Sequence, residues 1–406
     1  MPQLHDDARG ALARTLGRPV PGWLMATADV VGLSLIALFL HGFVQRNFLA
    51  QGDLVVYRFA GRAVLDGLDP YVQENLAALA NRPVFPFLYP PVALLPCMAI
   101  ATLSWHALAL TWMWSKIVLL GVLILVGAKG LVRLEMILPM ALVAIFGWNA
   151  AALRDLSTGN IAILEAALVW AGLVCYVRGH RWAFAALIVI AACFKLAPAA
   201  FLALLLVPTE RARPSGLLFA GSGLALLLIV GGPLLVGPAA DYRHFWGRVS
   251  DLSVTGSVNP SIIEFTQSLV AATGWKLPWT HPEPVIWGVF CAGLVAISLP
   301  FLTRCYRARD ARRWCMTAAF LYVLLVPRPM AYGFVMLVPA CLYFSPSFFG
   351  GLLGPWLLAL TLSAQGLFKF TSIVSTSPMV VYAPSLLNVC LWLLVLGDTR
   401  KPADSH

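Results

Sequence analysis

Few polar side chains lie within or beside the apolar stretches of this 406-residue sequence, and those few could do chemistry. Asp53 follows a glycine just after an apolar stretch, in the run Gln51-Gly-Asp-Leu-Val-Val-Tyr57. An acid at the start of a helix is often only an N-cap. The alternative is a carboxylate fixed at the membrane surface, where it could act as a general base on a hydroxyl group. Tyr57 and Arg58 lie one turn further on and could support it.

Two cations are candidates for binding an anionic group. Lys195 lies deep in apolar sequence, in the run Ala-Ala-Cys-Phe-Lys195-Leu-Ala-Pro198. Such a lysine can simply extend its ammonium group to the membrane interface. Alternatively, it binds a phosphate at the membrane face, because charges inside membranes often mark functional sites. Arg328, between Pro327 and Pro329, is a second candidate, since a guanidinium binds phosphate bidentately.

Other polar residues near predicted helix ends have ordinary structural explanations. Arg154 and Asp155 could pair with each other, and Gly159 with the residue after it could form a turn and a helix start. The alternative is that polar residues near these helix ends line a polar cavity. The candidates for the substrate pocket are Tyr89, Asn160, His244 and Asn259. No zinc-protease, Walker, serine-hydrolase or Cys/His cluster motif is found, so we expect no metal site and no cofactor.

The elements that position these residues are predicted to be membrane helices. The chain is 60% hydrophobic and 11% charged, whereas soluble domains carry roughly 25% charged residues. A bilayer crossing takes about 20 apolar residues, so the chain has room for about 11 to 13 membrane helices. We therefore predict a single all-α, polytopic transmembrane helical bundle over residues 1–406.

The distribution of basic residues predicts the orientation. The net charge of +10 is interpreted as a positive-inside bias rather than nucleic-acid binding, because the arginines cluster in short loops such as 303–314. Two long loops, 45–88 and 238–284, then face the periplasm of a bacterial inner membrane, each with an amphipathic helix, at 53–66 and 262–272.

Two apolar segments do not fit this orientation as ordinary single spans. We expect residues 90–103 to re-enter the membrane and residues 182–207 to form two half-helices that meet near Lys195 and Pro198. The alternative makes both segments regular spans and moves four basic residues outside, which the positive-inside rule disfavours.

An ordered series of short motifs resembles the GT-C type membrane glycosyltransferases that use polyprenyl-phosphate sugars. Within that group the chain is most similar to glycosyltransferase family 87, in particular to its α-1,2-mannosyltransferases. The similarity covers roughly residues 53–343. The motifs are Asp53-Leu-Val-Val-Tyr57, Gly67-Leu-Asp-Pro70-Tyr71, Tyr89-Pro-Pro91, Gly159-Asn160, Lys195-Leu-Ala-Pro198 and Asn259-Pro-Ser261.

The resemblance implies an inverting transfer of mannose or arabinofuranose from a polyprenyl-phosphate donor to a lipid or glycan acceptor. Asp53 would be the general base, and Lys195, Arg328 and Tyr332 would contact the donor phosphate. Some family members have a histidine where this chain has the run 328–332, Arg-Pro-Met-Ala-Tyr. The alternative functions are a transporter or flippase of lipid-linked sugars, for which only Lys195 fits, and a non-catalytic membrane scaffold.

Overall fold

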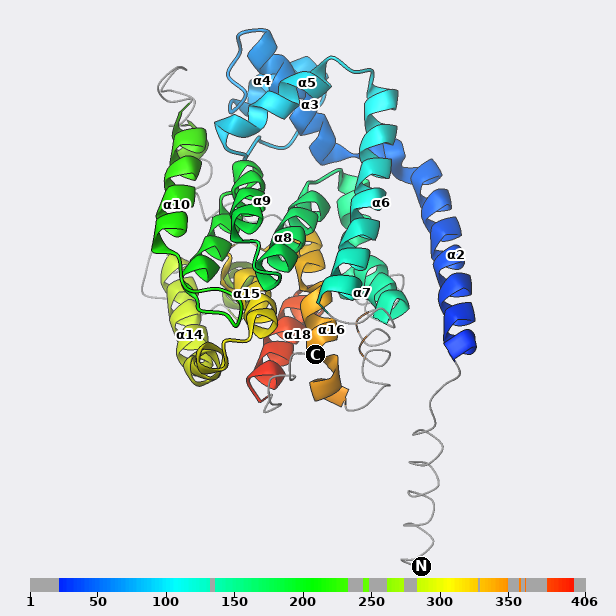
Figure 1. Ribbon diagram of the computed structural model, residues 1–406. Coiled ribbons are helices and arrows are strands. Elements are labelled where there is room, and N and C mark those ends of the chain that lie inside the picture. The colour runs from blue at the N-terminus through cyan, green and yellow to red at the C-terminus, as the bar shows by residue number, and fades with distance from the viewer. Residues whose placement is uncertain are drawn as a thin grey trace, which may run out of the picture. The chain divides into compact units, whose positions relative to one another are not determined.

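The computed structural model describes residues 22–131, 136–232, 244–247, 261–273, 283–327, 329–349, 358, 362 and 378–397. These residues form helices and connecting loops, and their only extended pairing is an isolated bridge between Thr209 and Ala212 (Figure 1). The predicted all-α fold is therefore confirmed. The chain divides into two compact units, residues 1–43 and 44–406, and helix α2 (Gly22–Asn47) supplies the described part of the first unit.

The second unit carries the remaining helices. In chain order they are η1 (Phe48–Ala50), α3 (Gly52–Leu65), α4 (Gln73–Ala80), η2 (Pro91–Ala93), α5 (Leu94–Ala101), α6 (Trp105–Gly130), α7 (Ile137–Thr158), α8 (Ala162–Val177), α9 (Arg181–Phe194), η4 (Ala197–Leu206), α10 (Gly216–Gly231), α13 (Ile262–Thr273), α14 (Glu283–Ala308), α15 (Ala311–Leu325), η5 (Ala331–Leu337), α16 (Val338–Phe349) and α18 (Pro378–Leu396).

Three of the described helical segments are long and apolar enough to cross a membrane: Ala26–Ala50, Trp105–Gly130 and Pro284–Ala308. Helix α7 is a fourth candidate, although it bends by 66° between Trp148 and Ala150. Seven further apolar helices are shorter, at 10–17 residues. Several apolar runs are thus broken into short helices. Among the described residues, full-length candidate spans are therefore fewer than the 11 to 13 membrane helices predicted.

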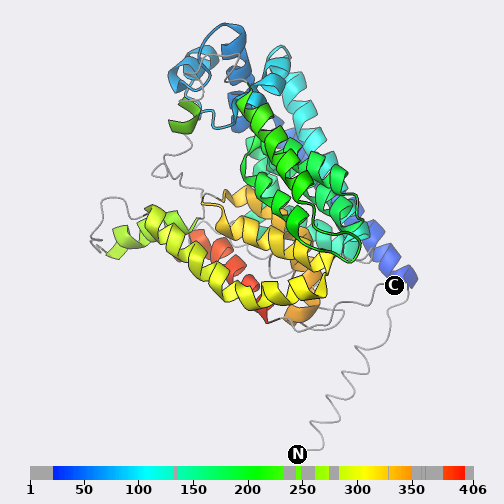
Figure 2. The same ribbon diagram turned by 60° about the vertical axis from the view of Figure 1, so that its left-hand side comes forward.

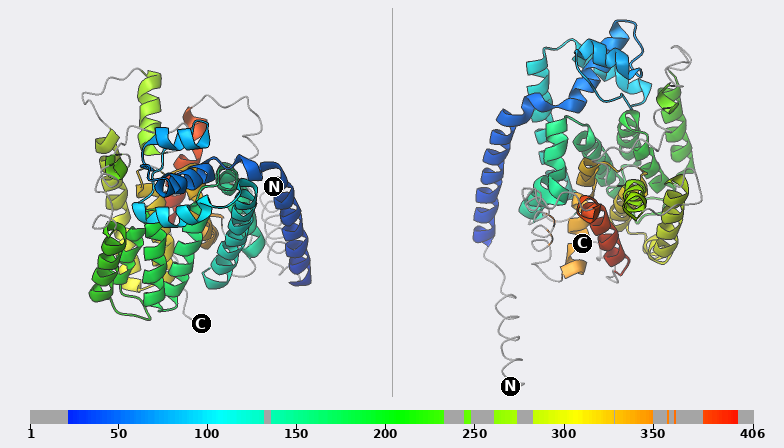
Figure 3. Two further views of the ribbon diagram at one scale, coloured as in Figure 1. Left: turned by 90° about the horizontal axis from the view of Figure 1, so that it is seen from above. Right: turned by 180° about the vertical axis from the view of Figure 1, so that it is seen from behind.

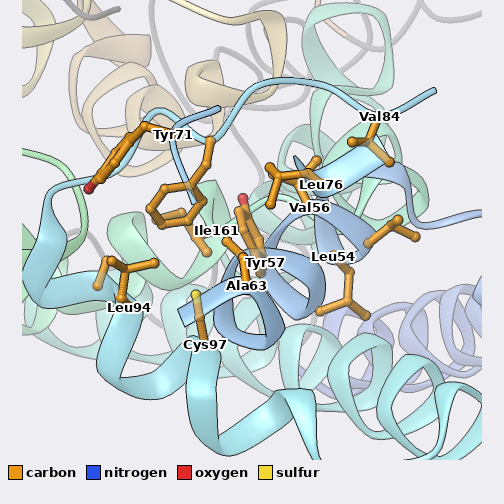
Figure 4. Packing of buried hydrophobic residues seen from close by; sticks show 14 of the residues in the cluster. Leu54, Val56, Tyr57, Ala63, Tyr71, Leu76, Val84, Leu94, Cys97 and Ile161 are labelled. Carbon is orange, nitrogen blue, oxygen red and sulfur yellow. The ribbon is translucent and has the colours of Figure 1, made fainter. Parts of the chain in front are cut away.

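Helices α3, α4 and α5 lie together at one end of α6 and α10, in blue and cyan at the top of Figures 1 and 2 and of the right-hand view in Figure 3. We call this group the α3–α5 layer. The expected amphipathic helix of the first long loop is present as α3, whose buried Leu54 and Tyr57 belong to one hydrophobic cluster with Leu94 and Cys97 of α5 (Figure 4). Helix α5 has only eight residues, about 12 Å of rise, so it cannot cross a bilayer alone.

A glycine permits the close packing inside the α3–α5 layer. A Cβ atom built on Gly61 would lie 2.1 Å from the backbone oxygen of Cys97 in α5, which is far inside van der Waals contact. Only glycine therefore fits where these two helices touch. Their contact fixes the direction of α3, and with it the direction of the acidic residue in its first turn.

Helices α9 and η4 form a hairpin whose two ends meet. At its base the Arg181 guanidinium, at the start of α9, donates to the carbonyl oxygens of Leu205 near the end of η4 and of Val207 just beyond it, over 3.2 and 3.3 Å. At its tip Lys195 has an extended backbone (φ −139°, ψ 130°) and Pro198 lies in the first turn of η4. The segment 182–207 thus consists of two half-helices that meet at Lys195, as expected.

Candidate active site

Four polar side chains from distant parts of the sequence meet where the α3–α5 layer contacts the other helices. The centre is Asn160, which lies just before α8 and is 3% exposed. Its Nδ2 is 2.7 Å from Asp53 Oδ2, 3.2 Å from the Tyr89 hydroxyl and 3.0 Å from the Tyr332 hydroxyl. Because a carboxylate only accepts, Asp53 fixes which end of the amide faces it.

The structure does not support a capping role for Asp53. The N-cap of α3 is Gln51, whose side chain instead donates to the carbonyl oxygens of Phe48 and Ala109. Asp53 lies in the first turn, where the helix dipole favours a negative charge. Burial raises the pKa of the Asp53 carboxyl, and the hydrogen bond from Asn160 opposes that rise. The group is therefore a partly buried, oriented carboxylate of increased basicity.

Tyrosine hydroxyls surround this carboxylate on the side of the α3–α5 layer. The hydroxyls of Tyr57 and Tyr89 are 2.6 Å apart, and their rings meet edge to face with centroids 5.1 Å apart. The Tyr71 hydroxyl donates to the backbone oxygen of Tyr89 over 2.8 Å. Burial raises the pKa of Tyr89 to about 12 and that of Tyr57 well above its ordinary value. Both remain neutral hydroxyls that can donate or accept hydrogen bonds.

A lysine lies at the edge of the cluster. The Lys195 ammonium, at the tip of the α9–η4 hairpin, is 5.9 Å from the centroid of the Tyr332 ring. It forms a 2.8 Å ion pair with Glu165 Oε2, while the Tyr322 hydroxyl donates to the other oxygen of Glu165. The Lys195 side chain is still 29% exposed. The Lys195 side chain is therefore partly accessible, and its ammonium is paired with Glu165.

A second ion pair lies behind Asn160. Lys116 in α6 is 2.8 Å from Asp155 Oδ2 near the end of α7, and their side chains are only 2% and 0% exposed. The interpretation that Asp155 pairs with its neighbour Arg154 is therefore wrong. Sequence reasoning missed both Lys116 and Glu165. The only signal for either was a charged residue inside an apolar helix, which is the same signal that identified Lys195.

The other predicted site residues lie elsewhere or are not described. Arg58 places its guanidinium over the ring of Phe59, 5.6 Å from its centroid, rather than beside Asp53. His244 Nδ1 lies 2.5 Å from Asp69 Oδ2 and is half exposed on the α3–α5 layer. Arg328 and Asn259 lie outside the described residues. Within the part of the chain that the structure describes, no three His, Cys, Asp or Glu side chains are grouped as metal ligands would be.

Comparison with known proteins identifies the family. The model of glycosyltransferase family 87 matches residues 87–327, which is more than half of the chain. No curated protein and no solved structure matches it. The match includes Tyr89, Asn160 and Lys195, whereas Asp53 and Tyr332 flank it. The resemblance seen in the sequence is thereby confirmed, and together with the apolar helices it identifies a multi-pass membrane glycosyltransferase with a sugar donor and an acceptor. The chain belongs to glycosyltransferase family 87.

Proposed function

We propose that this chain moves a sugar from a polyprenyl-phosphate donor to a hydroxyl of a lipid or glycan acceptor, with inversion and with Asp53 as the general base. The observation that carries this proposal is the contact between Asp53 and Asn160. A buried amide holds a partly buried carboxylate of raised pKa in one orientation, among neutral tyrosine hydroxyls. A base needs this fixed geometry to take a proton in the transition state.

The proposed reaction is a single displacement. The acceptor oxygen attacks the anomeric carbon and forms the new C–O bond, while the proton of the acceptor hydroxyl passes to the Asp53 carboxylate. The bond between the anomeric carbon and the phosphate oxygen breaks, and its electron pair leaves with the polyprenyl phosphate. Attack opposite the leaving group inverts the anomeric carbon. Phosphate is a good leaving group, so one carboxylate suffices and no general acid is required.

Lys195 is proposed to bind the donor phosphate, whose negative charge grows as the glycosidic bond breaks. Its side chain is partly exposed, and its ammonium lies beside the Tyr332 ring, at the edge of the cluster that holds Asp53. A cation fixed before the reaction stabilises developing charge without reorganisation. The Tyr332 hydroxyl, which already accepts from Asn160, would contact the phosphate as well. Arg328, four residues before Tyr332 in the sequence, is proposed as a further phosphate ligand.

The proposed location is the bacterial inner membrane, with the site on the periplasmic side. This orientation rests on the arginines at the end of α14 and the start of α15, within residues 303–314, which the positive-inside rule assigns to the cytoplasm. Mannose and arabinofuranose are the proposed sugars, and they follow from the resemblance to family members that use polyprenyl-phosphate donors.

A reconstitution assay tests this function. The purified chain in proteoliposomes is offered radiolabelled polyprenyl-phosphate mannose or arabinofuranose, or a nucleotide sugar, together with lipid and glycan extract. We expect label in a new glycosidic product with a polyprenyl-phosphate donor and none with the nucleotide sugar. Transfer from the nucleotide sugar would refute the donor class. Movement of lipid-linked sugar across the bilayer without a product would instead favour a flippase.

A further inference from the structure

The turn between α7 and α8 is held at both ends by one aspartate. Asp155 Oδ1 accepts a 3.1 Å hydrogen bond from the backbone N–H of Ala162, across the turn. The Lys116 ammonium contacts Asp155 twice, pairing with its carboxylate and donating to its backbone oxygen. These contacts fix the separation between Asp155 and Ala162, and thereby the conformation of the turn that contains Asn160.

A single face of α6 holds this turn. Trp112 and Lys116 are four residues apart, so they project from the same side of the helix. The Trp112 indole N–H donates to the backbone oxygen of Gly159 over 2.9 Å, and Lys116 holds Asp155. The residue that follows Gly159 is Asn160, so the two contacts from α6 fix the backbone on which the Asn160 amide is mounted.

The same turn is pressed against the start of α3. Gly159 has φ +77°, and a Cβ atom built there would lie 2.8 Å from Gln51 Cβ and 2.9 Å from Leu54 Cβ. Gln51 and Leu54 bracket Asp53 in sequence. Helix α6 holds the turn, and the turn contacts the segment that carries Asp53. If the turn moves relative to α6, the distance between Asn160 and Asp53 therefore changes.

We propose that Trp112 and the Lys116–Asp155 ion pair are positioning residues that hold residues 155–162 so that the Asn160 amide meets the Asp53 carboxylate. None of the three forms a described hydrogen bond with Asp53, so the proposed positioning acts through Asn160. The Trp112 ring also packs against that of Tyr57, with centroids 6.2 Å apart, and W112F keeps an aromatic ring there. A buried ion pair often adds no net stability over an apolar pair of the same size, so stability alone is a weak reason to place one here. The inference rests on the proposed role of Asp53 as the base.

The acidic limb of the pH–rate profile is the readout, because it reports ionisation of the base in the free enzyme. The groups that act on the Asp53 pKa besides its own burial are Asn160, Asp155, Lys116, Lys195 and the hydroxyls nearby, Tyr57, Tyr89 and Tyr332. Loss of the Asn160 hydrogen bond raises the Asp53 pKa. Neutralising both members of the pair removes a raising effect from Asp155 and a lowering effect from Lys116, which oppose each other. A variant that leaves both charges in place reports the lost positioning alone.

Two variants test the inference, each measured for kcat/KM against pH with the radiolabelled donor. W112F removes the indole donor without changing charge, and the double variant K116M/D155N replaces the ion pair by a neutral pair of similar size. We expect kcat/KM at neutral pH to fall roughly tenfold in each, about the effect of one lost hydrogen bond, and the acidic limb to move to higher pH. W114F on another face of α6 is the matched control and should leave the profile unchanged.

The outcomes separate the inference from the proposed function. If both variants elute as folded protein and keep the wild-type limb and rate, the positioning role is wrong. A limb that moves to lower pH in either variant would also overturn it, because loss of the Asn160 hydrogen bond raises the Asp53 pKa. If the double variant does not fold, W112F decides. If D53N retains transfer, the general-base assignment fails whatever the positioning variants show.

Discussion

Replacement of Gly159 by alanine should displace the turn that carries Asn160. The backbone at Gly159 has φ +77°, which glycine adopts freely and other residues adopt at a cost. A Cβ atom there would meet Gln51 Cβ at 2.8 Å, Leu54 Cβ at 2.9 Å and the Leu54 backbone nitrogen at 3.1 Å. All three atoms belong to or adjoin the backbone at the start of α3, so none can swing aside as the end of a long side chain would.

The expected cost has two parts. A non-glycine residue in the left-handed conformation costs roughly 1–2 kcal/mol. An extra methyl group forced into a packed contact costs about 1–3 kcal/mol more. The variant should therefore lose about 2–5 kcal/mol, or relieve the overlap by moving the turn away from α3. That movement would lengthen the 2.7 Å bond between Asn160 and Asp53, so the protein that still folds should transfer sugar slowly.

The assay is the thermal unfolding midpoint in detergent together with the initial rate of transfer. Gly121→Ala in the middle of α6 is the control, because no described atom outside the helix's own backbone lies within 4 Å of its Cβ position and the backbone is helical. We expect the control to keep the wild-type rate and to have a midpoint at or above that of the wild type, because alanine favours a helix more than glycine does. Gly159→Ala should lower both the midpoint and the rate. A Gly159→Ala protein with the wild-type midpoint and the wild-type rate would refute the packing of this turn against α3.

Three further predictions concern the same region. Asn160→Ala should reduce kcat/KM roughly 10–100-fold and move the acidic limb to higher pH, since the hydrogen bond that lowers the Asp53 pKa is lost; an unchanged limb would exclude the contact. Gly61→Ala should lower the unfolding midpoint, because its Cβ would overlap the Cys97 backbone oxygen, and a wild-type midpoint would contradict that packing. Lys195→Met should raise KM for the phosphate-linked donor and lower kcat, with partial recovery in Lys195→Arg, and equal kinetics in all three proteins would exclude a phosphate role.

Local features of the fold could be read from the sequence because they depend on neighbouring residues. The helical spacing of apolar residues predicted a helix over 53–66, and the structure has α3 at Gly52–Leu65. The charge distribution led us to expect that residues 182–207 form two half-helices that meet near Lys195 and Pro198, and α9 does end there. Asp53, Tyr89, Asn160 and Tyr332 were selected separately, and the fold brings them together.

The partners of the buried charges could not be predicted, because they depend on which helices are neighbours. Asp155 is adjacent to Arg154 in sequence, yet it pairs with Lys116, 39 residues away on α6. Lys195 was identified without its partner Glu165 for the same reason. Arg58 follows Tyr57 directly, but adjacent residues on a helix point in different directions, so only the tyrosine reaches the cluster.

The most direct test of the central claim is sugar transfer by Asp53→Asn. Asparagine keeps the size of the side chain but cannot accept the acceptor's proton at neutral pH. The variant and the wild-type chain are compared in donor binding and in the initial rate with radiolabelled polyprenyl-phosphate sugar. The account predicts that Asp53→Asn folds and binds the donor as the wild type does, while transfer falls at least about 100-fold, the lower range for a general base. Transfer at the wild-type rate by a folded Asp53→Asn protein would contradict it.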